Sequence, residues 1–81
     1  MPHKSTQFAG DRALVALGGA LRDARRQKGL SQEALAVDAQ VERSYLGAIE
    51  RGEVNVTLMV LTRICRELKT APSAVLLAAG M

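Results

Sequence analysis

The residues whose types and spacing could do chemistry gather in residues 42–51, which we predict to be a short helix ended by Gly52. If Leu46 and Ile49 point inward, a rotation of about 100° per residue turns other side chains outward or to the flanks. These side chains are Arg43, Ser44, Tyr45, Ala48 and Arg51. Arg can form a bidentate contact with guanine, Ser can pair with several bases, and Ala can touch a thymine methyl group. The pattern fits a helix that reads base edges in the major groove, but from these residues alone an ordinary solvated face is the favoured interpretation.

Other kinds of site find little support in the sequence. His3 is the only histidine and Cys65 the only cysteine, so neither a zinc site nor an internal disulfide is expected. The sequence contains no Ser/His/Asp set and no phosphate-binding glycine loop. Cys65 shares an apolar stripe of a predicted helix, as a structural thiol would, with Leu58, Leu61, Ile64 and Leu68. We therefore expect a protein that is not an enzyme and has no cofactor, metal or evident small-molecule ligand.

Length and composition favour a small binding module. The 81 residues are 48% hydrophobic, 23% charged and 2% aromatic, which suits one folded domain rather than a disordered or fibrous chain. The formal charge of +3 and the pI of about 9.6 favour a polyanionic partner. No signal peptide or membrane-spanning stretch is evident, so we expect a cytoplasmic protein that does not enter a membrane. We predict a flexible arm over residues 1–10 and one domain over residues 11–81.

The apolar spacing predicts an all-α fold of five short helices around one core. The first helix follows an Asp11 cap and ends at Gly29. The other four are expected at about 31–39, 42–51, 58–68 and 72–79. Gly18 and Gly19 each cost the first helix about 1 kcal/mol relative to Ala, so packing must stabilise it or its beginning must fray or kink.

A longer string, LRDARRQKGLSQEALAVDAQVERSYLGAIERGEVNVTLMVLTRICREL, carries a more specific signal. Its diagnostic parts are Arg25, Gly29-Leu30-Ser31-Gln32-Glu33, Ile49-Glu50-Arg51-Gly52 and Asn55-Val56-Thr57-Leu58. Over residues 21–77 the chain resembles the Cro/repressor-like (XRE) family of helix-turn-helix DNA-binding domains. The resemblance implies a compact lambda-repressor-like fold and a sequence-specific transcriptional regulator. It further implies that a homodimer binds a pseudo-palindromic operator in double-stranded DNA, with residues 42–51 as the recognition helix.

The resemblance also assigns roles to residues outside that helix. Gln32 is similar to the family's glutamine that contacts the DNA backbone or an outer base. Arg25 and Glu50 correspond to a family ion pair that joins the first helix to the recognition helix. Glu50 lies within about 60° of the core direction on a helical wheel and Arg25 lies at the edge of an apolar face, so the residues themselves favour the same pairing.

Three positions depart from the family pattern. Gln40 stands where the turn usually has Gly, and a left-handed backbone there would carry roughly 1–2 kcal/mol of strain. Glu42 replaces the usual Ser or Thr cap and places a negative charge near the expected phosphate path. Ala71 replaces a Ser cap before Pro72, which suits the first position of the last helix.

The apolar residues near the C-terminus exceed what one small core needs, which predicts a dimer surface. That surface is expected to contain Val75, Leu76, Leu77 and Met81, with Met59 and Val60 as further candidates. The alternative is that Leu76 and Leu77 merely close the core. A stand-alone domain of this length resembles the controller proteins of restriction-modification systems, although phage-type regulators share the pattern. The second functional hypothesis is an antitoxin or another protein-interaction module that binds DNA secondarily.

Overall fold

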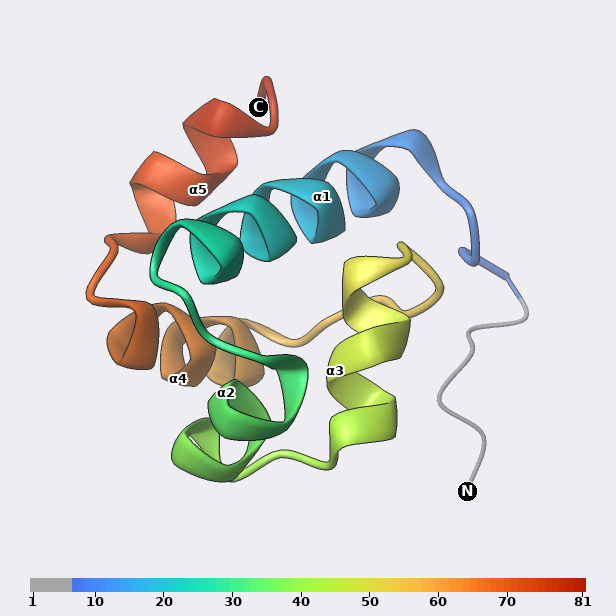
Figure 1. The fold of residues 1–81 in the computed structure, drawn as a ribbon. Coiled ribbons are helices and arrows are strands. Elements are labelled where there is room, and N and C mark those ends of the chain that lie inside the picture. The colour runs from blue at the N-terminus through green and yellow to red at the C-terminus, as the bar shows by residue number, and fades with distance from the viewer. Residues whose placement is uncertain (1–6) are drawn as a thin grey trace.

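A computed structural model describes residues 7–81, and it confirms the prediction of five helices (Figure 1). No strand occurs within that range. The helices are α1 (Arg12–Gln27), α2 (Gln32–Ala39), α3 (Arg43–Glu50), α4 (Leu58–Leu68) and α5 (Pro72–Ala78). Residues 7–81 contain no helix that is both long and apolar enough to span a bilayer.

Capping residues explain where most helices begin. Asp11, Ser31 and Thr57 accept hydrogen bonds from backbone N–H groups two or three residues later, at 2.8, 3.0 and 3.2 Å. Each bond satisfies a donor that the first turn of a helix would otherwise leave unpaired. Glu42 and Ala71 precede α3 and α5 without a side-chain capping bond. These two helix starts therefore depend more on packing than the other three.

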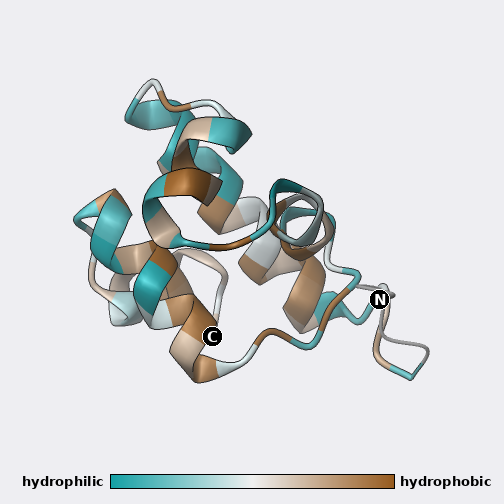
Figure 2. Cartoon of the chain, turned by 90° about the horizontal axis from the view of Figure 1, so that it is seen from below, coloured by the Kyte–Doolittle hydropathy of each residue, from teal (hydrophilic) through white to brown (hydrophobic). Residues whose placement is uncertain are grey.

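One hydrophobic core joins the five helices. Helix α1 packs against α3 and α5, while α2 packs against α3 and α4. Hydrophilic and hydrophobic residues alternate along the helices, which is typical of amphipathic helices around a shared core (Figure 2). The largest fully buried side chains are Leu21, Leu35, Leu46, Ile64, Leu68 and Cys65.

Leu58, which was predicted to share the apolar stripe of α4 with Cys65, does not lie in the core. Its side chain is 70% exposed, and that of Met59 is 71% exposed. Both residues lie in the first turn of α4, before the buried stripe begins at Leu61. Helical spacing places Leu58 on the same side of α4 as the buried residues, but the first turn of the helix extends past the core.

The approach of α1 to the end of α3 requires glycine on both sides. A Cβ atom on Gly18 would lie against the carbonyl oxygen of Ile49 and 2.7 Å from that of Glu50. A Cβ atom on Gly52, whose φ is +74°, would lie 2.6 Å from the Cα atom of Val15. Helix α1 nevertheless runs without a break through Gly18, because packing against α3 compensates for its low helix propensity.

The turn before α1 is hydrogen-bonded to Gly52, which follows the end of α3. Residues 7–10, which belong to the predicted arm, form a turn, and Gly10 N–H donates to the carbonyl oxygen of Gly52 at 2.8 Å. Residues 1–6, including His3, lie outside the described residues. The end of α3 is therefore contacted by both α1 and the turn that leads into it.

The two adjacent glycines of α1 offer a matched test of this packing. We expect Gly18→Ala to lower the free energy of unfolding by at least roughly 1–3 kcal/mol, because the added methyl group overlaps backbone oxygens that cannot rotate away. Gly19→Ala should raise it by up to about 1 kcal/mol, because nothing lies within contact distance and Ala favours the helix. Urea unfolding of both variants measures the difference, and a Gly18→Ala variant as stable as Gly19→Ala would contradict the close approach.

Candidate nucleic-acid interface

Helices α2 and α3 are joined by a tight turn at Gln40–Glu42. Gln40 adopts a left-handed conformation, with φ 59° and ψ 45°, as expected if the residue replaces a glycine. Its carbonyl oxygen accepts a hydrogen bond of 2.8 Å from Nη2 of Arg63 on α4. The next residue, Val41, donates its N–H to the carbonyl of Ala36 at 2.9 Å. These bonds hold the strained turn and fix how α3 leaves α2.

A buried ion pair joins α1 to the end of α3, as predicted. Arg25 Nε donates to Glu50 Oε2 at 2.7 Å, and Arg25 Nη2 donates to Glu50 Oε1 at 3.0 Å. Arg25 and Glu50 are only 7% and 4% exposed. Arg25 Nη1 also donates to the carbonyl of Leu30 in the link between α1 and α2, at 2.8 Å. The hydrogen bonds to Glu50 raise the pKa of Arg25 above its ordinary value, so Arg25 stays charged at neutral pH.

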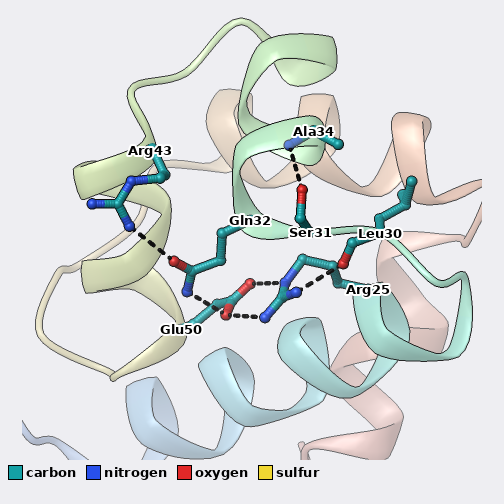
Figure 3. A network of polar contacts seen from close by, with 7 residues as sticks. All are labelled: Arg25, Leu30, Ser31, Gln32, Ala34, Arg43 and Glu50. Atoms are coloured by element: carbon teal, nitrogen blue, oxygen red, sulfur yellow. Dashed lines mark hydrogen bonds and ion pairs between the residues drawn. The ribbon is translucent and has the colours of Figure 1, made fainter.

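Gln32 connects this ion pair to the surface (Figure 3). Its Nε2 atom donates to Glu50 Oε1 at 2.9 Å, and its Oε1 atom accepts from Arg43 Nη1 at 3.4 Å. The first contact is short and part-buried, whereas the second is long and exposed. A continuous polar chain therefore runs from Arg25 in the core to Arg43 at the start of α3.

The exposed face of α3 consists of Arg43, Ser44 and Arg51, with Gly47 between them. Gly47 is covered by its neighbours, because a Cβ atom there would lie 3.1 Å from Arg51 Nη1 and 3.6 Å from Gln32 Oε1. Sequence reasoning missed Gly47, although the spacing of residues 43, 47 and 51 by four places them on one helical face. The missing side chain leaves room for Arg51 and Gln32 to lie over α3.

The two arginines of this face differ in their partners. Arg51 forms an exposed ion pair with Glu53, at 3.1 Å from Nε and 3.2 Å from Nη2. Arg43 contacts the neutral amide of Gln32, and no ion pair involves it within residues 7–81. Its positive charge is therefore more available to an anionic partner than that of Arg51.

The prediction that Ala48 faces outward was wrong, since this residue is only 2% exposed. The chain after α3 turns back over this end of the helix, and Glu53 N–H donates to the carbonyl of Ala48 at 3.0 Å. Helix α3 is thus covered on more sides than the Leu46–Ile49 stripe suggested. Tyr45, which was predicted on the flank of the helix, is half-buried and packs against the core.

The predicted dimer residues also separate into two groups. Val75 is 3% exposed and belongs to the core, so its assignment to a dimer surface was wrong. Leu76 is half-buried and packs against the same core. Leu77 and Met81 are 74% and 61% exposed. The rotation of α5 explains the difference, because consecutive residues of a helix cannot share one face.

The described residues include one buried thiol and no cluster of metal ligands. No group of three or more metal-ligating side chains occurs within residues 7–81. Cys65 is 1% exposed, and burial raises the pKa of its thiol. A thiol of this kind resists ionisation and fills space in the core.

Comparisons with known proteins agree with this geometry. A family model described as a helix-turn-helix domain matches residues 16–78. The chain is 38% identical over 61 residues to the control protein C.SmaI of Serratia marcescens, covering 75% of this chain and 73% of that protein.

Solved structures of regulatory proteins are also similar to this chain. The restriction-modification controller protein C.AhdI from Aeromonas hydrophila is 42% identical with a TM-score of 0.75, over 76% of this chain and 94% of that one. SinR, a master regulator for biofilm formation solved in complex with DNA, is 31% identical with a TM-score of 0.71, over 74% of this chain and 97% of that one.

Proposed function

The chain belongs to the family of helix-turn-helix domains of the Cro/repressor-like type, and from this premise we propose that it is a sequence-specific regulator whose helix α3 enters the major groove. Its relatives are control proteins and gene regulators rather than enzymes, as predicted. The chain is accordingly a DNA-binding regulatory protein. The observation that carries the proposal of base recognition is the exposed Arg43 at the start of α3, which is supported from α2 by Gln32.

The exposed face of α3 suits a division of roles. Arg43 can form a bidentate contact with guanine O6 and N7, and Ser44 beside it can pair with several bases. Arg51 lies at the other end of the helix, and contact with a phosphate would compete with its bond to Glu53. Backbone N–H groups at the start of α2 provide a second place for a phosphate.

The names of two relatives support a more specific role. C.SmaI is a control protein and C.AhdI is a restriction-modification controller, and both match most of this chain. We therefore favour a controller protein that regulates transcription of a restriction-modification locus over a phage-type regulator. A reporter gene placed under the upstream DNA of such a locus tests this role directly, because its expression should change when the chain is produced.

Homodimerisation on a two-fold symmetric operator completes the proposal. Leu77 and Met81 are large apolar side chains left open to solvent at the C-terminus. An apolar patch on so small a chain is covered most simply by its own copy across a two-fold axis. Two recognition helices would then meet two half-sites about one helical turn apart.

The first prediction concerns Arg43. Duplexes selected by the chain from a randomised DNA library should bind the Arg43→Ala variant about 5- to 150-fold more weakly, because a bidentate base contact is lost. Binding to unselected DNA should fall much less, since phosphate contacts remain. Fluorescence anisotropy with both kinds of duplex measures the two losses.

Lys69→Gln is the control for the loss of one positive charge. Lys69 ends α4 next to α5, and its left-handed backbone is of the kind that Gln40 already adopts. This variant should lose little affinity for either kind of duplex. An Arg43→Ala variant that loses equal affinity for selected and unselected DNA would mean that Arg43 contacts only phosphate.

The second prediction concerns the dimer. Leu77→Glu should make the chain monomeric at micromolar concentrations and lower its affinity for the selected duplex by about 100-fold or more, because the two half-sites are no longer linked. Val37→Glu is the control, since Val37 on α2 is 75% exposed and Leu77 is 74% exposed. Analytical ultracentrifugation, with circular dichroism to verify folding, measures the oligomeric state.

Point substitution is preferable to deletion of the C-terminus, because a deletion would remove the core residue Val75. A wild-type chain that is monomeric, or a Leu77→Glu variant that remains dimeric, would exclude this surface. Loss of the dimer in Val37→Glu alone would assign the interface to α2.

A further inference from the structure

We propose that Glu50 and Gln32 are positioning residues for base recognition: Glu50 fixes the orientation of the Gln32 amide, and the outward oxygen of that amide holds the Arg43 guanidinium. This inference rests on the proposed function and names what determines its specificity. It assigns Gln32 a role different from the direct backbone or outer-base contact that the family resemblance implied.

Glu50 requires hydrogen-bond donors from its neighbours. Its two carboxylate oxygens accept hydrogen bonds from Arg25, and Oε1 also accepts from Gln32 Nε2 at 2.9 Å. An ionised carboxylate accepts hydrogen bonds and donates none. The Arg25 guanidinium, which is protonated at neutral pH, donates to both oxygens of this carboxylate. Gln32 must therefore turn its nitrogen, and not its oxygen, toward Glu50.

Arg43, in contrast, requires a hydrogen-bond acceptor. A guanidinium group offers five N–H donors and no acceptor. Only the oxygen of the Gln32 amide can accept from Arg43 Nη1, which lies 3.4 Å away. If the Gln32 amide were rotated by 180°, its oxygen would face the Glu50 carboxylate, which also only accepts. Its nitrogen would face the Arg43 guanidinium, which also only donates. Both neighbours thus select the same orientation of Gln32 (Figure 3).

Gly47 has no side chain and so leaves space for the Gln32 amide on α3. A Cβ atom on this residue would lie 3.6 Å from Gln32 Oε1 and 3.8 Å from Gln32 Nε2. The Gln32 amide therefore rests directly on the exposed face of α3. Arg51 crosses the same face, but its guanidinium is held by Glu53. The two arginines of this face consequently have separate supports.

The consequence is a partly ordered Arg43 before DNA arrives. Within residues 7–81 only one of its five N–H groups is engaged, so two remain for guanine O6 and N7. Limiting the rotamers of a long side chain lowers the entropy lost on binding. The long distance to Gln32 allows the guanidinium to adjust as it meets the base. Base discrimination at this position should depend on Gln32 even if Gln32 touches no base.

The DNA arm of the test is a double-mutant cycle. Gln32→Met keeps the length of the side chain but removes both polar atoms. We expect it to reduce discrimination among bases at the position read by Arg43 by about tenfold, measured with duplexes selected by the wild-type chain. In an Arg43→Ala background the same substitution should change discrimination by less than about twofold, because the residue that it positions is already gone.

A second measurement, made without DNA, tests whether Gln32 restricts the motion of the Arg43 side chain. Nuclear magnetic resonance relaxation of the arginine Nε–H groups should show a more mobile Arg43 in Gln32→Met than in the wild-type chain. Arg51 should be unchanged, because Glu53 holds it. Urea unfolding verifies that the variant is folded under these conditions.

The two arms separate this inference from the proposed function. Equal mobility of Arg43 in the two chains, or effects of Gln32→Met and Arg43→Ala that simply add, would overturn the positioning role. A wild-type chain that selects no duplex would overturn the proposed base recognition, while the relaxation of Arg43 would still decide whether Gln32 holds it.

Discussion

The bidentate ion pair between Arg25 and Glu50 is the interaction on which the remaining structure depends. Two charges that are almost fully buried must be paired, because leaving either one alone in the core is costly. Their partners come from α1, from the link after it, from α2 and from the end of α3. The pair therefore fixes three helices relative to one another, and Gly18 allows their backbones to approach closely enough for it to form.

The same interaction connects stability with recognition. An apolar core could hold α3 in place, but it could not set the orientation of a polar group at the surface. The Glu50 carboxylate does both, because the oxygen that it shares between Arg25 and Gln32 determines which end of the Gln32 amide faces Arg43. In contrast, the exposed pair of Arg51 and Glu53 is screened by solvent and constrains only its own neighbourhood.

Local signals in the sequence predicted the helices and part of the site well. Caps, helix-ending glycines and Pro72 placed the five helices, and helical spacing together with family resemblance placed Arg25 and Glu50 opposite each other. Burial on helices with several neighbours was harder to predict. Ala48 and Val75 were assigned to exposed faces and are buried, because spacing reveals one stripe but not how many elements cover a helix. Gly18 counted only as a weak helix former, since its close neighbours in α3 are distant in sequence.

The unfolding free energy of Arg25→Met, measured in urea against Arg51→Met, tests the central role of the ion pair most directly. The account predicts a loss of roughly 3–5 kcal/mol for Arg25→Met, which leaves Glu50 buried without its charged partner. Arg51→Met breaks an exposed pair and should cost under about 1 kcal/mol. Equal losses in the two variants would contradict the account.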